Sequence, residues 1–453
     1  MFIPEDVQYI LNTLTASGFE AYAVGGCVRD TLLGRSPNDW DICTSARPEQ
    51  TIGCFSGCPI VETGLKHGTV TLIRNHIPYE ITTFRQDGDY ADHRRPEQVQ
   101  FVSSLREDLA RRDFTIGAMA ADREGTILDL YDGRGDLQKK LVRCVGDPNR
   151  RFQEDALRIL RGLRFAAQLD FSIHPDTARA MEEEKELLRY VSGERIYAEM
   201  NKLLMGPGAA EVLKAHGSVL TAVFPELIPT MGFLQHHPCH DKDVWGHTLE
   251  AFSYAKPDIH VRWALLFHDI GKPHCFSMDE AGIGHFYGHP QKSAEMARDI
   301  FSRLRTDRAT RDMVCSLIEN HHYDVPVTKK HARRCLLRFG PQLLPLLLEV
   351  KRCDALAHVH TPQSQMRYEA VVEMTALVEE ALRQNTCCNV TDLQISGREL
   401  ITLGVPKGPK IGEILNRLLL DVVDGSCENH LEALMHRTQL YMQNSLTARK
   451  EEP

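Results

Sequence analysis

The sequence has no long hydrophobic run and no segment typical of a secretory leader. Among its 453 residues, no apolar stretch reaches the roughly 18 residues that a transmembrane helix requires. The N-terminus, MFIPEDVQYI, has no basic segment followed by an apolar core. These absences argue against a membrane partner, and we expect a cytoplasmic protein.

The sequence also has no cysteine framework and no overall positive charge. Its 13 cysteines are scattered and odd in number. Cys54 and Cys58 form a CxxxC pair, but no second pair matches it, so reduced thiols are favoured over disulfides or zinc. Because the net charge is −9, binding to nucleic acid requires a local basic patch.

No internal repeat or low-complexity segment is evident, and the composition is that of an ordinary globular protein. The length predicts two to four domains at roughly 150 residues each. The alternating runs GTVTLI, YEITTF and QVQFV predict strands before residue 103, and an amphipathic helix is expected over residues 5–17. Beyond residue 139 the pattern is helical.

A glycine pair and an arginine lie in the segment 24–44, VGGCVRDTLLGRSPNDWDICT. Glycine has no Cβ, so the backbone at Gly25 and Gly26 can approach a phosphate closely. Arg29 follows where a new helix would offer free N–H groups to an anion. The segment therefore predicts a phosphate-binding turn; a simple glycine turn is the alternative.

Two carboxylates end the same segment. Asp39 and Asp41 are spaced i, i+2, so on a strand both side chains would leave one face. Paired oxygen ligands suit a Mg²⁺ ion that bridges substrate phosphates. Glu80 is a candidate third carboxylate, although a cross-strand salt bridge explains it equally well. Two solvated aspartates are the alternative for the pair.

Three adjacent charges precede the apolar segment FTIGAMA. Beside a triphosphate, Arg112 would bind phosphate or ribose and Asp113 would orient it. A solvated helix end is the alternative.

Residues 139–165 form a basic patch, with eight basic residues against three acidic ones. Within it, Arg158, Arg161 and Arg164 recur every third residue and repel one another, an arrangement that a helix accepts most readily beside an anion. Asp155 and Arg158 lie one turn apart if one helix carries both. A carboxylate accepts from the exocyclic amine of C or A, and a guanidinium donates to the ring acceptors, so the pair would disfavour U and G. A Glu154–Arg158 surface salt bridge is the alternative.

A second constellation combines histidines and aspartates in the order H…HD…H…H…D. This is ligand chemistry for a first-row metal, including two-metal sites. The candidate ligands are His247, His268, Asp269, His289, His321 and Asp354. His322 in place of His321, or His285 in place of His289, are alternatives, and Lys272 would lie near a substrate phosphate.

These motifs together resemble the class II CCA-adding tRNA nucleotidyltransferases of the polymerase β-like superfamily, with an HD domain of the phosphohydrolase type. The matching strings are VGGCVRD…DWD, RRDFTIGA, DLYDG, EDALR and SGERIYAEMNKLL, where Glu194 and Arg195 read as structural. Gly117 departs from the family's usual Asn. The resemblance implies that Asp39 and Asp41 hold Mg²⁺ and that Asp155 and Arg158 select the base. It assigns the triphosphate and ribose to Gly26, Arg29, Arg112, Arg161 and Arg164.

The expected fold is therefore α+β: a nucleotidyltransferase head with a small mixed sheet flanked by helices, then an all-helical neck, body and tail. The expected boundaries are 1–140, 141–206, 207–365 (with the HD domain) and 366–453. In the tail, Lys407 and Lys410 are a plausible tRNA phosphate contact.

The expected function is addition of CCA to tRNA from CTP and ATP, with an accessory HD phosphohydrolase that uses Ni²⁺ or Mn²⁺. Four alternatives remain at this point: an enzyme that adds only CC or only A, a poly(A) polymerase, a chain that acts mainly as a phosphohydrolase through the HD site, and a pure RNA-binding role.

Overall fold

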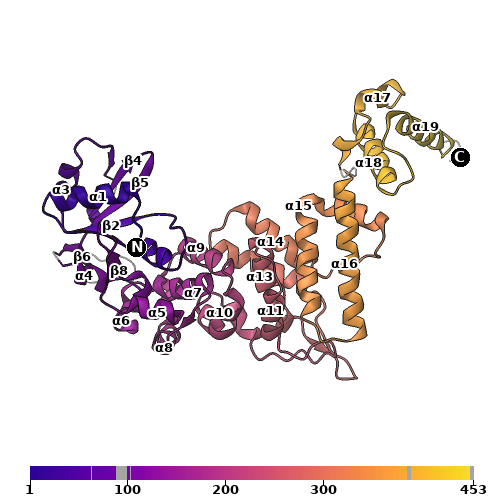
Figure 1. Cartoon of the computed structure of the whole chain (residues 1–453). Coiled ribbons are helices and arrows are strands. Elements are labelled where there is room, and N and C mark those ends of the chain that lie inside the picture. Colours follow the sequence, from indigo (N-terminus) through magenta and orange to yellow (C-terminus); the bar gives the residue numbers. More distant parts are fainter. Residues whose placement is uncertain (63, 88–98, 103, 385–388, 449–453) are drawn as a thin grey trace. The chain divides into compact units, whose positions relative to one another are not determined.

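The computed structural model describes residues 1–453 apart from 63, 88–98, 103, 385–388 and 449–453. It divides into two compact units, one of Met1–Ile228 with Ile300–Thr306 and the other of Pro229–Asp299 with Asp307–Pro453. A mixed sheet lies in the N-terminal part and the later elements are nearly all helices, so the predicted α+β class is confirmed (Figure 1). The finer four-part division stays a prediction. Within the described residues, no helix combines the length and apolar character that crossing a bilayer requires.

Seven strands form the sheet of the first unit. Only β2 and β5 pair in parallel; the other neighbours are antiparallel. The predicted runs GTVTLI and YEITTF correspond to β4 and β5. In spatial order the strands are β3 (Ile60–Val61), β4 (Thr69–Arg74), β5 (Ile77–Thr83), β2 (Asp41–Thr44), β1 (Ala21–Val24), β8 (Met119–Ala121) and β9 (Ile127–Asp129).

Five helices and a two-stranded ribbon accompany this sheet. The first helix is the predicted amphipathic one, and it contacts β1 and α3. Leu105 and Leu109 of α4 pack with Val24, Cys43 and Phe84, so a dry core lies beside the strand ends that carry the glycine turn. These elements are α1 (Glu5–Ala16), α2 (Gly26–Leu32), α3 (Pro48–Cys54), α4 (Leu105–Ala110), α5 (Gly133–Gln138), β6 (Arg85–Asp87) and β7 (Val99–Phe101), the last within the predicted QVQFV strand.

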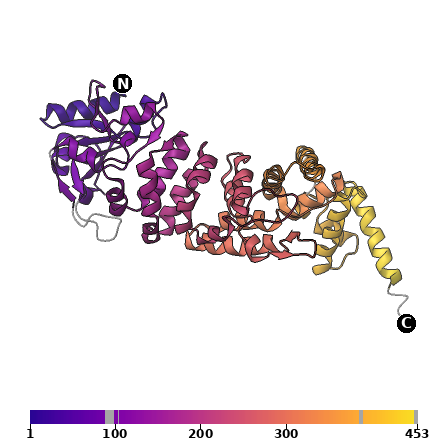
Figure 2. The same ribbon diagram turned by 90° about the horizontal axis from the view of Figure 1, so that it is seen from below.

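Helices complete the first unit, shown from purple to magenta after the sheet in Figure 2. The helix pair α7 and α9 packs closely, and α6 packs on α8. The elements are α6 (Pro148–Glu154), α7 (Leu157–Leu169), α8 (Pro175–Glu183), α9 (Gly193–Leu204), α10 (Ala209–His216) and the paired β10 (Leu141–Val142) and β11 (Ser172–Ile173).

The second unit is built around a buried helix, α12, in which Trp263 and Phe267 have no exposed surface. Its second half, Trp263–Phe267, is wholly apolar and buried, and the chain that follows carries His268 and Asp269 into the interior. Within this part of the chain, α12 contacts α11, α14 and α15. The elements are α11 (Val244–Ser253), α12 (Ile259–Phe267), α13 (His289–Arg303, which ends in the first unit), α14 (Arg308–Asn320), α15 (Lys329–Leu356), α16 (Pro362–Arg383) and the hairpin β12 (Ser277–Met278) and β13 (Gly284–His285).

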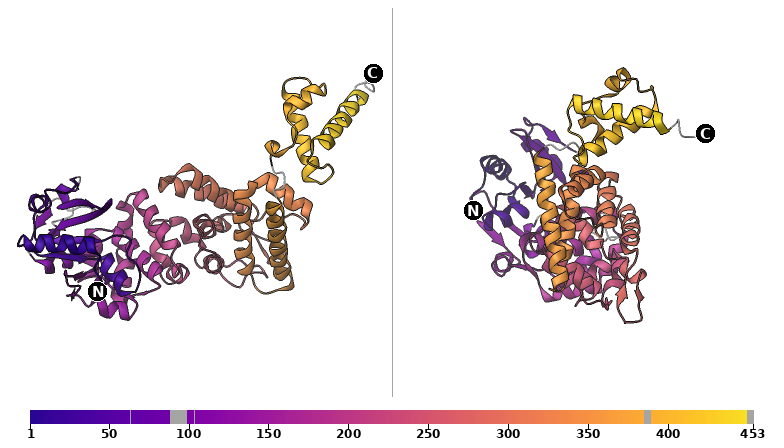
Figure 3. Two further views of the ribbon diagram at one scale, coloured as in Figure 1. Left: turned by 45° about the horizontal axis from the view of Figure 1, so that its top comes forward. Right: turned by 90° about the vertical axis from the view of Figure 1, so that its right-hand side faces the viewer.

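The long α15 is kinked at Gly340, whose φ is +74° and which precedes a proline. It packs along α16 (Figures 1 and 3). Three further helices share an apolar core that includes Leu400, Leu418 and Leu434, and Figure 3 shows them in yellow. They are α17 (Gly397–Thr402), α18 (Pro409–Val423) and α19 (Leu431–Ala448).

Short 3₁₀ turns connect many of these elements. They are η1 (Leu65–His67), η2 (Thr115–Gly117), η3 (Lys185–Tyr190), η4 (Gly217–Ala222), η5 (Pro225–Thr230), η6 (Lys272–His274) and η7 (Val390–Asp392).

Candidate active site

The glycine pair forms the turn between β1 and α2. Gly25 has φ +84° and ψ −126°, a conformation that is essentially restricted to glycine. Its N–H donates to the Met119 carbonyl oxygen at 3.2 Å, which ties the turn to β8. Because Val24 pairs with Asp41 across β1 and β2, the turn lies beside the start of the strand that carries the predicted carboxylates.

The expected strand begins at Asp41, so Asp39 lies in the preceding loop. The prediction that the two carboxylates share one strand face is therefore wrong. The parallel register pairs Ile42 with Ile81, and continuing it by one residue sets Asp41 beside Glu80. Among the described residues, Glu80 has no ion pair, and its neighbour on β4 is Thr71. The salt-bridge explanation of Glu80 is therefore not supported.

The three carboxylates affect one another electrostatically. Asp41 is accessible to solvent, yet partial burial, followed by the charges of Asp39 and Glu80, raises its pKa against the opposing effect of Arg112. Like charges held close together, with oxygen as the only ligand atom, fit a hard divalent cation, which would relieve their repulsion. The arrangement suits the predicted metal.

A polar pocket of about 250 Å³ lies where the segment after α4 meets α6, α7 and α9. It brings together four of the predicted nucleotide-binding residues: Arg112, Asp155, Arg158 and Arg161. Its full lining is Arg111, Arg112, Asp113, Asp155, Leu157, Arg158, Arg161 and Arg195. Gly26, Arg29 and Arg164 lie outside this lining. Two arginines of the basic patch at 139–165, Arg158 and Arg161, thus lie in one pocket with arginines from outside it.

Two buried carboxylates hold the arginines of this pocket. Asp113 pairs with Arg161 at 2.6 Å, and although burial raises its pKa, the charges of Arg161 and Arg158 hold that pKa below its ordinary value. Arg112 instead pairs with Asp108 at 3.4 Å, and Arg111 pairs with the same carboxylate at 2.8 Å. The prediction that Asp113 orients Arg112 is therefore wrong: Asp108 does so.

Asp155 and Arg158, the proposed base-selecting pair, were expected on one helix, but the structure places them on two elements. Asp155 has an extended backbone, with φ −141° and ψ 104°, and ends α6, while Arg158 belongs to α7. The Asp155 carboxylate accepts the Leu157 N–H at 3.1 Å, which is the way an aspartate satisfies a free helical N–H. This capping contact explains the break, because it competes with continuation of the helix.

Arg158 is 8% exposed and already has protein partners. It pairs with Glu154 at 2.8 Å and donates to the carbonyl oxygens of Arg151 at 3.2 Å and Arg111 at 3.1 Å. The Glu154–Arg158 salt bridge that was the alternative is present, in a guanidinium that also lines the pocket.

Arg29 and Arg164 converge on Phe165, a residue that the motif analysis did not single out. The ring centroid lies 5.2 Å from the guanidinium carbon of Arg29, 5.6 Å from that of Arg161 and 4.0 Å from that of Arg164. Arg164 also forms a 2.6 Å ion pair with Glu199 of α9. The structure thus places Arg164 in the α7–α9 packing. The position of Phe165 directly after the arginine repeat was the sequence feature that could have indicated these cation–π contacts.

All six predicted HD ligands converge in the second unit. Each is at most 9% exposed. Asp269 lies at the centre: its carboxylate oxygens are 3.2 Å from His268 Nε2, 3.3 Å from His289 Nε2, 3.7 Å from His247 Nε2 and 3.9 Å from His321 Nε2. Asp354 Oδ1 lies 2.9 Å from His247 Nε2 and 3.6 Å from His268 Nε2.

The outward nitrogen of each histidine is held by the backbone. Nδ1 donates to a carbonyl oxygen in His268 (Leu265, 2.8 Å), His289 (Phe286, 2.8 Å) and His321 (Ile318, 2.6 Å). The buried Nε2 atoms of these three make no hydrogen bond to any described residue. An imidazole fixed in this tautomer directs a lone pair at the carboxylates, and two facing acceptors require a cation between them. The donor set therefore fits a metal centre.

Two subsets have ligand atoms within 4.8 Å of one another, one of His247, His268 and Asp354 and the other of His289, His321 and His322. His321 and His322 lie in the same subset, so the geometry does not choose between them as ligands. His285 lies in the β12–β13 hairpin and pairs with Asp279 at 2.9 Å, so the alternative of His285 for His289 is not supported. Lys272 is buried, 2.7 Å from Asp269.

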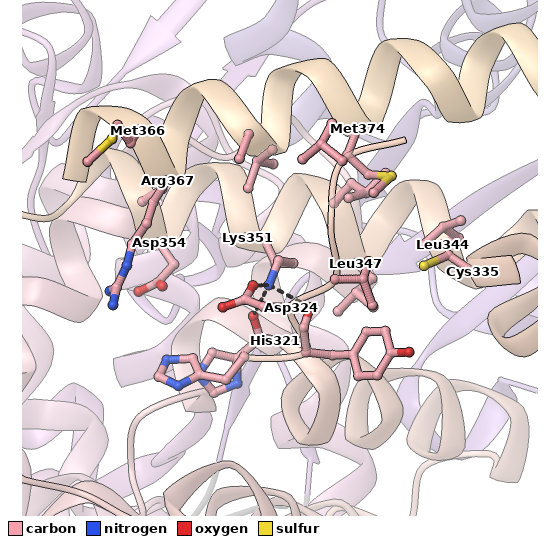
Figure 4. A pocket seen from close by; sticks show the side chains of 18 of the residues that line it. His321, Asp324, Cys335, Leu344, Leu347, Lys351, Asp354, Met366, Arg367 and Met374 are labelled. Carbon is pink, nitrogen blue, oxygen red and sulfur yellow. Dashed lines mark hydrogen bonds and ion pairs between the residues drawn. The ribbon is translucent and has the colours of Figure 1, made fainter. Parts of the chain in front are cut away.

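A larger pocket, of about 440 Å³, begins at this centre. His321, His322 and Asp354 line one part of it, and Leu344, Leu347 and Met374 line another. Figure 4 shows His321 and Asp354 on one side of the view, Arg367 above them, and Leu344, Leu347 and Met374 on the other side. The Lys351 ammonium ion bonds the His321 carbonyl oxygen at 3.0 Å and pairs with Asp324 at 2.7 Å, which braces the loop after α14.

Family models match three regions: a poly A polymerase head domain at residues 21–143, a probable RNA and SrmB-binding site of polymerase A at 170–231, and an HD domain at 244–358. The CCA-adding enzyme of Geobacillus thermodenitrificans is 35% identical over 448 residues, 96% of this chain and 97% of that one. The CCA-adding enzyme of Streptococcus suis is 35% identical, over 94% of each chain.

The chain belongs to the CCA-adding enzyme family. A solved structure of the Bacillus stearothermophilus CCA-adding enzyme in complex with CTP is 29% identical, with a TM-score of 0.70 over 99% of this chain and all of that one. The fold is shared with the Thermotoga maritima CCA-adding enzyme complexed with tRNA, at a TM-score of 0.63, 19% identity and coverage of 97% and 96%. As a member of this family, the chain is a tRNA nucleotidyltransferase, and divalent metal use is implied.

Two residues of this family member have partners that the motif analysis did not predict. Asp108 was passed over, although it is fully buried and pairs with both Arg111 and Arg112. Arg195 was interpreted as structural, yet it pairs with Asp155 at 3.2 Å inside the pocket. For Asp108, the spacing at i−3 and i−4 from the two arginines was the one sequence feature that indicated the pairing. For Arg195, no sequence feature indicated the contact with Asp155. Gly117, the departure from the family pattern, lies in η2, where a side chain would meet Asp113 at an ordinary 3.8 Å.

Replacing Gly25 by alanine in this family member is expected to weaken both the fold and nucleotide use. The positive φ costs a non-glycine residue about 1–3 kcal/mol, and a Cβ would lie 2.9 Å from Arg112 Nη1, so that guanidinium must move. Thermal unfolding and kcat/KM for CTP incorporation measure the two effects. Gly18→Ala is the control, because Gly18 has φ +86° with nothing within 4 Å. Equal catalytic loss in both variants would contradict the role of Arg112.

Proposed function

We propose that this chain completes the 3′-terminal CCA of tRNA, using CTP and ATP without a nucleic acid template. The observation that carries the proposal is one polar pocket that contains Arg112, Asp155, Arg158 and Arg161, in the same unit as the carboxylates around β2. Solved structures of similar proteins support CTP, ATP and tRNA as the partners of this chain, because they are complexes with these molecules. The cytoplasmic location stays a prediction.

In the proposed reaction, the 3′-hydroxyl of tRNA attacks the α-phosphate and pyrophosphate leaves. Asp39 and Asp41 would hold Mg²⁺, which would neutralise charge on the phosphates and lower the pKa of the attacking hydroxyl. Gly26 allows close approach of the triphosphate, and Arg29 lies on the helix that follows. Positioning of this kind supplies most of the catalysis in phosphoryl transfer.

Arginines of the head and the neck complete the proposed triphosphate and ribose site. Arg112, fixed by Asp108, and Arg161, fixed by Asp113, present guanidinium groups that are already oriented, so little side-chain entropy is lost when a phosphate binds. Arg164 acts through its place in the α7–α9 packing. Asp155 accepts from the amine of C or A, and Arg158 donates to the ring acceptors.

We further propose that the domain boundaries follow the motifs, with a head at 1–140, a neck at 141–206, a body at 207–365 and a tail at 366–453. Lys407 and Lys410 remain the proposed tRNA contacts of the tail. In this division the head and neck together hold the nucleotide, and the tail holds the outer part of tRNA.

Trimmed tRNAs test the main proposal. A tRNA lacking CCA, one ending in C and one ending in CC are each incubated with CTP, with ATP and with both, and the 3′ ends are sequenced. We expect C to be added only until the 3′ end carries CC, and A only after CC. Addition of C alone or of A alone would indicate a partial enzyme, and a long A tail would indicate a poly(A) polymerase; the family relatives favour neither.

A second activity is favoured by the histidine–aspartate centre. We propose that it is an accessory phosphohydrolase site that takes Ni²⁺ or Mn²⁺ and acts on 2′,3′-cyclic or 3′-phosphate ends of RNA or on a small nucleotide. The supporting observation is the set of buried Nε2 atoms that face Asp269 and Asp354 beside an open pocket. The buried ammonium of Lys272, held by Gln235 at 2.8 Å, is positioned to meet a phosphate charge.

A further inference from the structure

Arg195 lies in the first turn of α9 and reaches the carboxylate proposed to read the base. Its Nη2 is 3.2 Å from Asp155 Oδ2 and 3.4 Å from Oδ1. Its Nη1 is buried and makes no hydrogen bond to the described part of the chain. Both side chains line the same pocket, so this contact lies within the nucleotide site.

The Asp155 side chain has few contacts that could fix its orientation. The residue lies between two helices in an extended conformation, and apart from Arg195 its carboxylate accepts one hydrogen bond among the described residues, from the Leu157 N–H to Oδ1. Oδ2 accepts only from Arg195 among the described residues, and its second lone pair can accept from a base amine. A carboxylate accepts best within its own plane, so its orientation decides whether it discriminates an amine from a carbonyl.

The pocket also holds cations that compete for Asp155. Arg158 and Arg161 line it, and Asp113 is already paired with Arg161. Without Arg195, Asp155 is expected to turn toward one of these guanidinium groups. That pairing would leave neither the Asp155 carboxylate nor the paired guanidinium available to bond the edge of the base.

We propose that Arg195 is a positioning residue for base selection, acting by holding Asp155 in the orientation that accepts C and A. This inference rests on the proposed function, since it concerns the choice among nucleotides at that site. It assigns a role in specificity to the SGERIY segment at the start of α9.

The test compares CTP with UTP in Arg195→Ala. The ratio of kcat/KM for the two nucleotides on tRNA lacking CCA is expected to fall by about tenfold or more, as the loss of one oriented, charged hydrogen bond implies. Glu194→Ala is the matched control: Glu194 lies in the same helical turn but pairs with Arg305 at the exposed surface, so the ratio should stay within about twofold. A folded Arg195→Ala with the wild-type ratio would overturn the proposal, since a purely structural contact would slow both nucleotides alike.

Two further measurements keep the inference separable from the proposed function. Equilibrium binding of CTP and UTP without tRNA reports base preference even if no nucleotide is added: loss of preference in Arg195→Ala supports the inference, and retained preference overturns it. If Arg195→Ala does not fold, Arg195→Gln is judged by the same criterion. In the double variant with Asp155→Ala, selectivity should equal that of Asp155→Ala alone; a further independent loss would contradict action through Asp155.

Discussion

Asp41→Ala is expected to abolish incorporation of CTP and ATP into tRNA that lacks its 3′ end, a loss on the order of a thousandfold or more. Asp41 begins β2, next to the glycine turn across β1 and beside Glu80 across β5, so it is the carboxylate at the centre of the proposed metal site. Removing it takes away a ligand and leaves Asp39 in a loop as the remaining member of the pair. Incorporation is measured with radiolabelled nucleotide under single-turnover conditions.

Asp41→Asn accompanies the alanine variant, because the amide keeps the side-chain volume and removes only the charge. Glu49→Ala, an exposed carboxylate on α3 of the same unit, is the control and should retain wild-type incorporation. The raised pKa of Asp41 indicates that its charge is opposed in the metal-free protein, so neither variant is expected to unfold the head. Undiminished incorporation by a folded Asp41→Ala protein would contradict the assignment of the active site.

His268→Ala is expected to remove phosphate release from 2′,3′-cyclic and 3′-phosphate ends in the presence of Ni²⁺ or Mn²⁺, by at least about a hundredfold. His268 is fully buried, and its Nε2 lies 3.2 Å from Asp269 and 3.6 Å from Asp354. The imidazole is therefore close to both carboxylates of the proposed metal site. Metal content after dialysis should fall together with phosphate release. CCA addition should be retained, because the head and neck residues lie in the other unit.

His285→Ala is the matched control for this experiment. Its imidazole pairs with Asp279 in the β12–β13 hairpin, away from the buried centre, so phosphate release and bound metal should be unchanged. Unaltered phosphate release in a folded His268→Ala protein would contradict the proposed phosphohydrolase site, while leaving the nucleotidyltransferase assignment intact.

Where local spacing determined geometry, the sequence was sufficient. Strands β4 and β5, the amphipathic α1 and the α+β order followed from the hydrophobic period. The HD candidates were also found from sequence, because adjacent His268 and Asp269 follow an apolar run of a helix. The structure brings them within 4 Å of a carboxylate oxygen of Asp269 or Asp354, while their role as ligands and their metal stay predictions.

The errors arose where a polar side chain chose its partner from another element. Asp155 caps α7 instead of continuing α6, Asp113 pairs with Arg161 and leaves Arg112 to Asp108, and Asp39 precedes its strand. Several guanidinium groups and carboxylates in one segment can pair in many ways, and sequence spacing alone ranks them poorly.

The sequence by itself determined which chemical groups this protein has: paired carboxylates, an arginine repeat and a histidine–aspartate set, each fixed by short-range order along the chain. Only the tertiary structure decided how they pair, and thereby gave Arg195 of α9 its contact with Asp155, 40 residues away. The physical reason is that hydrogen bonds and ion pairs depend on distances of a few ångströms, and those are set by how helices pack rather than by position in the sequence.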